Sequence, residues 1–369
     1  MKKILNPDLV YLISLTRVPQ IGPLHARALL RIFGTAEAVF RTPVNELEKL
    51  EGIGPVRARS IRGFRDFSGS EKEIRFLERY RIRALSLSDP GYPQRLLTAE
   101  DAPFLLFYKG SADTNPKRCI SVVGTRGNSE YGKAVTEKII GELAAYGPTI
   151  VSGLAFGIDA LAHRQAIRKG LPTIAVLAHG LTSLYPPEHR SLSEQILHAG
   201  GLLTEYTSGI KADKHRFPIR NRIVAGISDC TLVIETGVRG GSMITADLAN
   251  GYFREVFAVP GRTTDFKSAG CNWLIRNNQA VLLDSAADLA KAMRWEPAHA
   301  AVVSQPIPSE DISEGAKRVL VILKERGQMH IDAIHSVSGF AAGKNAAIML
   351  ELEMKGWIVS QPGRIYRIR

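Results

Sequence analysis

The chain has 369 residues, a net charge of +12, 45% hydrophobic residues and 23% charged residues. This length suits two or three domains, and the composition excludes an intrinsically disordered chain. Cys119, Cys230 and Cys271 lie far apart without metal-ligand spacing, which excludes a disulfide scaffold and a zinc site. The N-terminus is basic but has no apolar segment before Asp8, and no apolar run approaches a membrane span. We therefore expect a cytoplasmic protein.

The basic excess is spread thinly along the chain. Residues 1–100 have a net charge of +6, residues 101–303 of +4 and residues 304–369 of +2. Such an excess suggests a polyanionic partner, although a solvated surface can also carry it. Because the chain has no basic tail, any nucleic-acid site must be gathered on a folded surface.

The N-terminal region, 1–85, contains an internal echo. Residues 20–27 and 52–59 both place a Gly-Pro turn before a helical pattern. This pattern resembles the SAM-like, helix-hairpin-helix module, whose helix N-termini can meet a DNA phosphate. A small helical module that only packs against its neighbour is the alternative.

Residues 86–296 alternate short apolar runs with amphipathic helical stretches, which predicts an α/β domain. Right-handed crossovers would give an extended Rossmann-like, doubly wound parallel sheet. The clearest helical patterns cover 131–146, 158–169 and 242–253. The predicted strands are 120–123, 149–152, 173–178, 201–204, 231–235, 256–259 and 280–283.

Residues 297–309 carry three prolines among small residues and are predicted to form a linker. In the following region, 310–369, helices are expected over 316–324, 330–337 and 344–355. A terminal hairpin is expected over 357–360 and 364–367. Three helices and a short β-wing predict a winged-helix-like domain, which is small but can fold alone.

Two glycine-rich loops each follow a predicted strand and precede a predicted helix. Such loops present backbone N–H groups and a helix N-terminus to an anion. Neither matches a dinucleotide or P-loop fingerprint, so we expect no cofactor. The first loop contains Gly124, Thr125 and Arg126, and the second contains Gly240, Gly241 and Ser242.

A basic segment at 214–222 interleaves cations with an aromatic ring. Lysine and arginine can neutralise phosphates, and Phe217 offers a face on which an unstacked base can lie. The mixture favours single-stranded nucleic acid over a duplex; a solvated basic loop with a buried Phe217 is the alternative. The polar residues of this segment that we expect to bind are Lys214, Arg220, Asn221 and Arg222.

A further loop–helix junction lies at 152–163. Asp159 is expected in the first helical turn, and His163 lies four residues later on the same helical face. The two could form an acid–base dyad, or they could belong to a hydrogen-bond network that starts the helix.

These segments together resemble the DNA-processing protein A family (DprA, also called Smf). The resemblance rests on Gly124-Thr125-Arg126, residues 152–163, 185–190, 217–222 and 240–246, and the Ala-Val-Pro-Gly run at 258–261. It covers nearly the whole chain. Many family members have Ser-Gly-Ser where this chain has Gly240-Gly241-Ser242.

The resemblance implies a protein of natural transformation that binds incoming single-stranded DNA, protects it and loads the recombinase RecA. It implies a homodimer and no established catalysis. The family's basic pocket would correspond to Arg126, Lys214 and Phe217, with a weaker match at Arg254. The dimer and RecA surface would lie near Asn272, Trp273 and Val281.

Two alternatives come from other classes of protein. The first is a Rossmann-like hydrolase of nucleoside monophosphates, a class that also has a Gly-Gly loop. Those enzymes place a glutamate a few residues after the glycines, whereas this chain continues to Asp247. The second is a regulator whose winged helix reads duplex DNA. The predicted recognition helix carries Glu351 and Glu353, so protein contact is at least as well supported for this domain.

Overall fold

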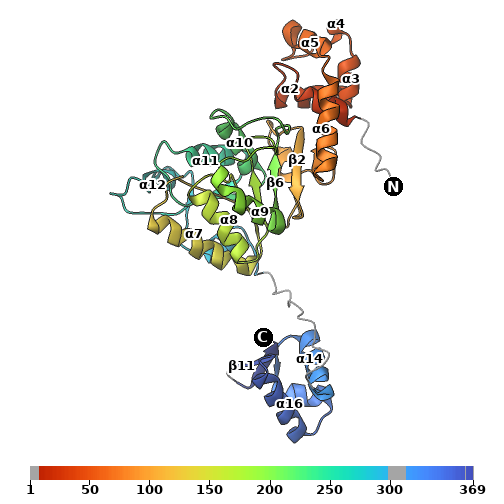
Figure 1. Ribbon diagram of the computed structural model, residues 1–369. Coiled ribbons are helices and arrows are strands. Elements are labelled where there is room, and N and C mark those ends of the chain that lie inside the picture. The colour runs from red at the N-terminus through yellow and green to blue at the C-terminus, as the bar shows by residue number, and fades with distance from the viewer. Residues whose placement is uncertain (1–7, 298–312, 362, 369) are drawn as a thin grey trace. The chain divides into compact units, whose positions relative to one another are not determined.

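The computed structural model describes residues 8–297, 313–361 and 363–368 (Figure 1). The described residues up to Pro297 form one compact unit, and those after it form a second. Apart from Pro297, the predicted linker lies outside the described residues. Within the described ranges, no helix combines the length and apolar character needed to cross a bilayer.

The first unit begins with a helical bundle that holds the two Gly-Pro turns. Pro23 stands in the first turn of α2 and Pro55 in that of α5, where a missing N–H costs nothing. Gly54 has a φ of +58°, a conformation that favours glycine. The helices are α1 (Leu9–Leu15), α2 (Pro23–Phe33), α3 (Ala36–Arg41), α4 (Val44–Leu47), α5 (Gly54–Gly63) and α6 (Phe67–Arg79).

A mixed sheet forms the centre of the unit. In the described residues it has nine strands in the order β1-β2-β6-β5-β4-β3-β7-β8-β9. The strands from β3 onward pair in parallel, as predicted. They are β1 (Arg83–Ser86), β2 (Leu105–Gly110), β3 (Cys119–Val123), β4 (Thr149–Ser152), β5 (Thr173–Val176), β6 (Gly200–Thr204), β7 (Cys230–Val233), β8 (Glu255–Ala258) and β9 (Val281–Leu282).

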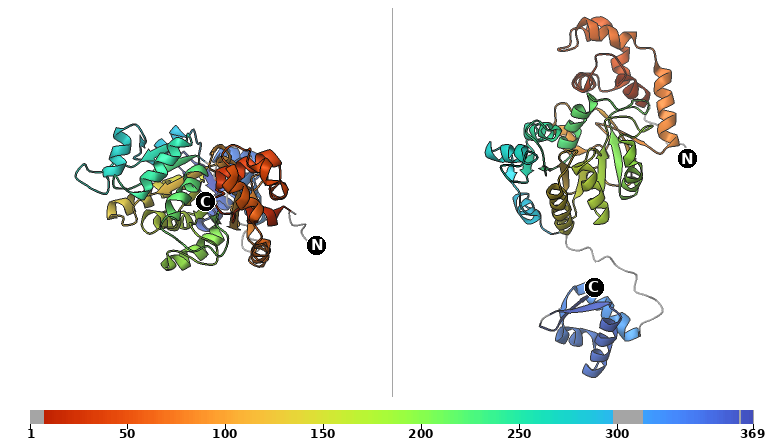
Figure 2. Two further views of the ribbon diagram at one scale, coloured as in Figure 1. Left: turned by 90° about the horizontal axis from the view of Figure 1, so that it is seen from above. Right: turned by 60° about the vertical axis from the view of Figure 1, so that its left-hand side comes forward.

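Helices cover both faces of this sheet, which confirms the doubly wound prediction. On one face α10 (Arg216–Gly226), α11 (Gly241–Gly251) and α12 (Ala269–Arg276) share a hydrophobic core with the strands. On the other lie α7 (Glu130–Leu143), α8 (Ile158–Arg168), α9 (Arg190–Ala199) and α13 (Ala286–Ala292). The left view of Figure 2 separates the two layers. Short 3₁₀ turns η1 (Gln94–Thr98), η2 (Ala144–Tyr146) and η3 (Pro187–His189) complete the unit.

The chain reverses its direction across the sheet at β3. It runs outward from β3 through β4 and β5 to β6, and then returns to the other side of β3 with β7, β8 and β9. In an open parallel sheet, a crevice forms at the carboxyl ends of the strands where this reversal occurs. The topology therefore places a binding crevice between the loops that follow β3 and β7.

The sequence prediction missed β1 and β2. These strands pair antiparallel, and β2 also pairs antiparallel with β6. No long helix separates them, so the alternation that revealed the other strands is missing. The predicted boundary between residues 85 and 86 falls inside β1, and the helical part ends with α6.

Glu73 of α6 anchors the loop that leads from β6 to α10. Its carboxylate is buried and accepts hydrogen bonds from the Ser208 backbone N–H at 2.8 Å and the Ser208 hydroxyl at 2.5 Å. Hydrogen bonds to an ionised group are among the stronger ones in proteins. The helical bundle is thus fastened to a loop that borders the crevice.

The second unit has the predicted winged-helix fold. Residues 329–330, 358–361 and 365–368 form a three-stranded sheet in the order β10-β12-β11, and the helices pack on it around Leu320 and Ile348. The elements are α14 (Glu314–Arg326), β10 (Met329–His330), α15 (Ile331–Ser338), α16 (Ala342–Met354), β11 (Ile358–Gln361) and β12 (Ile365–Ile368).

A buried ion pair supports the junction between β6 and α10. Arg222 of α10 donates to the Glu205 carboxylate and to the backbone oxygen of Asp101. The side chains of Arg222 and Glu205 are 7% and 10% exposed. Burial raises the pKa of Glu205, and Arg222 opposes that shift.

We predict that Arg222→Leu destabilises the protein by about 3–5 kcal/mol, because it leaves the Glu205 carboxylate buried without its partner. Urea unfolding at neutral pH measures the change. The exposed Lys214→Ala serves as the control and should change stability by no more than about 0.5 kcal/mol. A loss below about 1 kcal/mol for Arg222→Leu would contradict this account of the junction.

Candidate nucleic-acid interface

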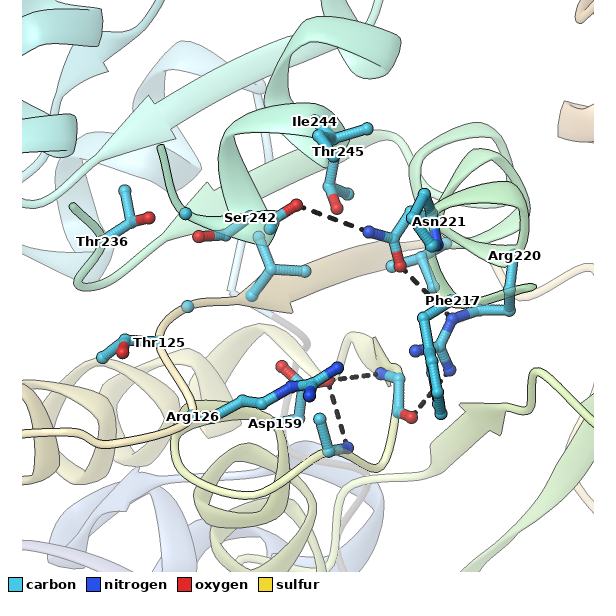
Figure 3. Close-up of a pocket in the computed structure, with 18 of the residues that line it drawn as sticks. Thr125, Arg126, Asp159, Phe217, Arg220, Asn221, Thr236, Ser242, Ile244 and Thr245 are labelled. Atoms are coloured by element: carbon cyan, nitrogen blue, oxygen red, sulfur yellow. Dashed lines mark hydrogen bonds between the residues drawn. The ribbon is translucent and has the colours of Figure 1, made fainter. Parts of the chain in front are cut away.

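A cavity of about 650 Å³ lies at the point of chain reversal. Its size is typical of ligand sites. Loops at the carboxyl ends of β3, β4 and β7 line it, together with the start of α10 (Figure 3). Ten of the predicted nucleic-acid residues meet here: Gly124, Thr125, Arg126, Lys214, Phe217, Arg220, Asn221, Gly240, Gly241 and Ser242.

The loops after β3 and β4 touch each other directly through a glycine. Gly157 has a φ of +75°, and a Cβ at this position would lie 2.2 Å from the backbone oxygen of Thr125. The Ile158 N–H donates to that same oxygen at 3.2 Å. A side chain at residue 157 would push the two loops apart. Glycine at this position therefore keeps the loops after β3 and β4 together along the cavity.

The N-terminus of α7 is occupied by a side chain of the protein itself. The buried carboxylate of Glu235 accepts hydrogen bonds from the Ser129 N–H at 2.9 Å and the Ser129 hydroxyl at 2.5 Å. In dinucleotide-binding folds, the first helix N-terminus holds the pyrophosphate. Here a carboxylate already supplies the negative charge that the helix dipole favours.

A carboxylate also stands in the first turn of α8, although no side chain caps its N-cap residue, Gly157. Asp159 is buried, and its carboxylate accepts from the N–H groups of Gly153 at 3.1 Å and Ala155 at 3.3 Å. Burial raises the pKa of Asp159, and the nearby Arg220 guanidinium opposes that shift. Asp159 therefore belongs to a hydrogen-bond network that starts the helix, as one of the two predicted alternatives states.

The N-terminus of α11 is different because it has neither a capping side chain nor a carboxylate in its first turn. Ser242 is 5% exposed, and its hydroxyl has no hydrogen-bond partner in the described structure. Asn221 approaches from α10, where its amide donates to the Gly241 backbone oxygen at 3.4 Å. Uncapped N–H groups, an unpartnered hydroxyl and the positive end of a helix together form a cradle for an anion.

A stack of side chains forms the opposite wall. The Arg126 guanidinium carbon lies 5.3 Å from the centre of the Phe217 ring. The Tyr185 ring centre lies 5.4 Å from that of Phe217. Arg126 and Lys214 are exposed, whereas Phe217 is half-buried. Cations and an aromatic surface thus meet at the mouth of the cavity.

Arg220 lies beneath this wall and is buried. Its guanidinium donates to the backbone oxygens of Gly153, at 2.7 Å, and Val176. Burial lowers its pKa to about 10, while the Asp159 carboxylate opposes that shift. Arg220 therefore holds the β4 loop in place and adds positive charge to the floor of the cavity.

Two predicted cavity residues lie elsewhere. The Arg222 guanidinium donates its hydrogen bonds to the Glu205 carboxylate and the Asp101 backbone oxygen. Arg254 precedes β8 at the opposite, amino edge of the sheet and donates to the backbone oxygen of Arg95 and the hydroxyl of Thr98. Neither arginine lines the cavity, because α10 turns Arg222 away and the strand direction separates Arg254 from the glycine loops. Their binding to nucleic acid stays a prediction.

The structure does not bring together the acid–base dyad, the other alternative for Asp159 and His163. The Nδ1 atom of His163 lies 2.7 Å from the Thr173 hydroxyl, while Asp159 bonds the β4 loop instead. Burial, followed by the charge of His189, lowers the pKa of His163 from 6.5 to about 3. The described residues also contain no His, Cys, Asp and Glu cluster that could hold a metal ion.

The predicted dimer residues lie around β9, at one end of the sheet. Val281 is 50% exposed on this edge strand. Trp273 packs partly against the core, and the Asn272 side chain exchanges two hydrogen bonds with the Gly261 backbone. Val281 is thus available for a contact, whereas Asn272 and Trp273 also support the fold.

Tyr185 is a cavity residue that the sequence prediction missed. It follows β5 by a long loop, and its ring packs on Phe217. The segment that contains Tyr185 contributes to the family resemblance, but no local sequence pattern indicates that its ring turns toward α10.

Because His163 is buried and neutral, we predict that the stability of the fold depends on pH in a specific way. A histidine whose pKa falls from 6.5 to about 3 on folding stabilises the protein fully above pH 6.5 and loses that contribution as the pH falls toward 3. By pH 5 the loss is about 2 kcal/mol. Urea unfolding of His163→Gln should lack this part of the loss between pH 7 and pH 5, whereas the exposed-site control His215→Gln should keep it. Equal pH dependence in both variants would contradict the assignment.

Family models match three parts of the chain. The model described as DNA recombination-mediator protein A matches residues 83–294. A SAM-like helix-hairpin-helix tandem matches residues 12–62, and a DprA winged helix domain matches residues 303–364. The first model covers more than half of the chain.

Curated proteins are similar over long stretches. Protein Smf of Synechocystis is 32% identical over 99% of this chain and 100% of its own length. Protein Smf of Escherichia coli is 32% identical over 81% of both chains. The DNA processing protein DprA of Streptococcus pneumoniae is 39% identical over 61% of this chain and 83% of its own.

Solved structures give the same relationship. The crystal structure of DNA processing protein A from Streptococcus pneumoniae has a TM-score of 0.68 at 32% identity and covers 78% of this chain and 98% of its own. A structure of the Helicobacter pylori protein, described for its unique single-stranded DNA binding mode, has a TM-score of 0.54 at 27% identity and covers 59% of this chain and 98% of its own. The chain therefore belongs to the DNA recombination-mediator protein A (DprA/Smf) family.

Proposed function

We propose that this protein binds single-stranded DNA in the cavity at the sheet's carboxyl edge and acts as a recombination mediator in natural transformation. One observation carries the proposal: an uncapped helix N-terminus with the unpartnered Ser242 hydroxyl faces an Arg126–Phe217 stack across one cavity. A site with an anion cradle on one side and an aromatic surface on the other suits a nucleotide unit of a strand. The single-stranded DNA binding mode described for the Helicobacter pylori relative supports the same ligand.

The phosphate backbone supplies most of the affinity in this proposal. A phosphate fits the start of α11, where Gly241 and Ser242 offer donors that no protein group uses. The corresponding ends of α7 and α8 hold Glu235 and Asp159, so they would repel a second phosphate. Arg126 and Lys214 at the cavity mouth neutralise neighbouring phosphates.

Stacking supplies the selectivity for single strands. A base can lie on Phe217 only when it has left the duplex, because paired bases are stacked on each other. Every base has a flat face, so little sequence preference is expected.

The partners beyond DNA follow from the family and from the sheet edge. We infer that the protein forms a homodimer through β9, whose Val281 and Leu282 are half-exposed on an open strand. We further infer that it protects incoming DNA and loads RecA onto it in the cytoplasm, in keeping with the family's description as a recombination mediator.

We assign the cavity no catalytic role. Its buried carboxylate, Asp159, is engaged by the loop N–H groups. Asp247, the first carboxylate after the glycine pair, is exposed on α11 and does not line the cavity. Asp213, on the loop before α10, also lines the cavity and accepts from the His215 N–H at 2.9 Å, so neither of the described carboxylates in the lining belongs to the glycine loop or to α11.

Replacing both cations at the cavity mouth tests the proposal. Arg126→Ala with Lys214→Ala should weaken binding of a single-stranded oligonucleotide at least about tenfold, or 1.4 kcal/mol. The slope of log affinity against log salt should also fall by about 0.7 for each phosphate contact removed. Fluorescence anisotropy across a salt series measures both quantities.

The matched control is Arg168→Ala with Lys138→Ala, which removes the same two charges from exposed positions on α8 and α7. It should leave the affinity almost unchanged. If both double variants bind as the wild type does at fixed salt, or if both lose affinity equally, the cavity is not the DNA site.

A further inference from the structure

An exposed aromatic residue stands beside the cavity but outside it. Phe266 belongs to the loop between β8 and α12, residues 259–268, and is 80% exposed. Burying a phenylalanine side chain would gain about 1.5–3 kcal/mol, so its exposure is unfavourable for the isolated fold. No ring or cation in the described residues stacks on it, in contrast to Phe217, which contacts both Arg126 and Tyr185.

The Phe266 ring lies beside the cavity rim. A Cβ at Gly237 would lie 3.4 Å from two carbons of the Phe266 ring. Gly237 also lines the cavity, as does Gly240 at the start of α11. The Phe266 ring therefore lies next to Gly237, a residue of the cavity lining, while Phe266 itself does not line the cavity.

Three cations lie close to Phe266 and Gly237 in the sequence. Arg239 follows Gly237 by two residues, and Arg262 and Lys267 belong to the Phe266 loop. Arg239 and Arg262 are exposed. An aromatic face among cations is the combination that single-strand-binding grooves use.

The one carboxylate of the loop is turned inward. Asp265 accepts from the Lys267 N–H at 3.1 Å and from the Ser268 hydroxyl at 3.1 Å. Its charge is thus used to shape the turn that presents Phe266. The other charged side chains of the loop are cations.

We propose that Phe266, with Arg239, Arg262 and Lys267, forms a second stacking subsite for single-stranded nucleic acid. A strand seated in the cavity leaves past Gly237, and its next exposed base stacks on Phe266 while the cations meet the flanking phosphates. This inference rests on the proposed function of the cavity and extends it from one nucleotide unit to a path along the sheet edge.

The length of the strand separates the two subsites in an experiment. Anisotropy is measured with oligothymidylates of about 4 and about 16 nucleotides, which span the site sizes known for single-strand-binding grooves. Phe266→Ala should leave the affinity for the short strand unchanged and weaken binding of the long strand about tenfold. Phe266→Trp, which keeps a stacking surface, should restore the long-strand affinity.

The matched control is Phe253→Ala. Phe253 is 97% exposed but lies in the turn before β8, at the opposite edge of the sheet. Its loss should change neither affinity. Arg239→Gln with Lys267→Gln should reduce the salt dependence for the long strand alone.

Three outcomes would overturn the second subsite. In the first, Phe266→Ala binds the long strand like the wild type. In the second, it loses affinity equally for both strands. In the third, sedimentation shows that the variant no longer associates with a second copy, while its DNA binding persists. Failure of the cavity proposal is distinguishable, because Arg126→Ala with Lys214→Ala would then bind the short strand as the wild type does. If the wild type binds the short strand but gains nothing with length, the second subsite alone is wrong.

Discussion

Three helix N-termini converge on one edge of a parallel sheet, and the way in which their positive ends are satisfied determines the rest of the site. Parallel pairing of β3, β4 and β7 places their carboxyl ends together, so α7, α8 and α11 start side by side. Glu235 and Asp159 neutralise two of these ends from within the protein. The third, at Ser242, has no internal partner. The fold thus builds one anion cradle and closes two others.

The surroundings hold this cradle against the aromatic wall. Arg220 ties the β4 loop to β5 from below, and its burial beside Asp159 fixes a cation under the cavity. Glu73, on a helix of the N-terminal bundle, anchors Ser208 in the loop that precedes Lys214 and Phe217. The helical bundle therefore contributes to the site by positioning, through a loop, residues that it does not touch.

The sequence predicted this architecture well where periodicity and turn chemistry are local. The seven parallel strands, the crossover helices and the winged helix all follow from such patterns. The antiparallel β1 and β2 were missed because no helix separates them. Arg222 and Arg254 were misplaced because basic composition does not reveal which way a helix turns a side chain or to which edge a strand carries it. Tyr185 and Phe266 reach the cavity and its rim through long loops, whose paths depend on tertiary contacts such as that between the rings of Tyr185 and Phe217.

The most direct test of the account places a negative charge in the free cradle. Ser242→Asp would give α11 the internal carboxylate that α7 and α8 already have, and Ser242→Asn has nearly the same size without the charge. The measurement is the affinity of each variant for a single-stranded oligonucleotide at fixed salt. We expect Ser242→Asp to bind at least about tenfold more weakly than Ser242→Asn, a difference of 1.4 kcal/mol. Equal affinities of the two variants would contradict the assignment of a DNA phosphate to the start of α11.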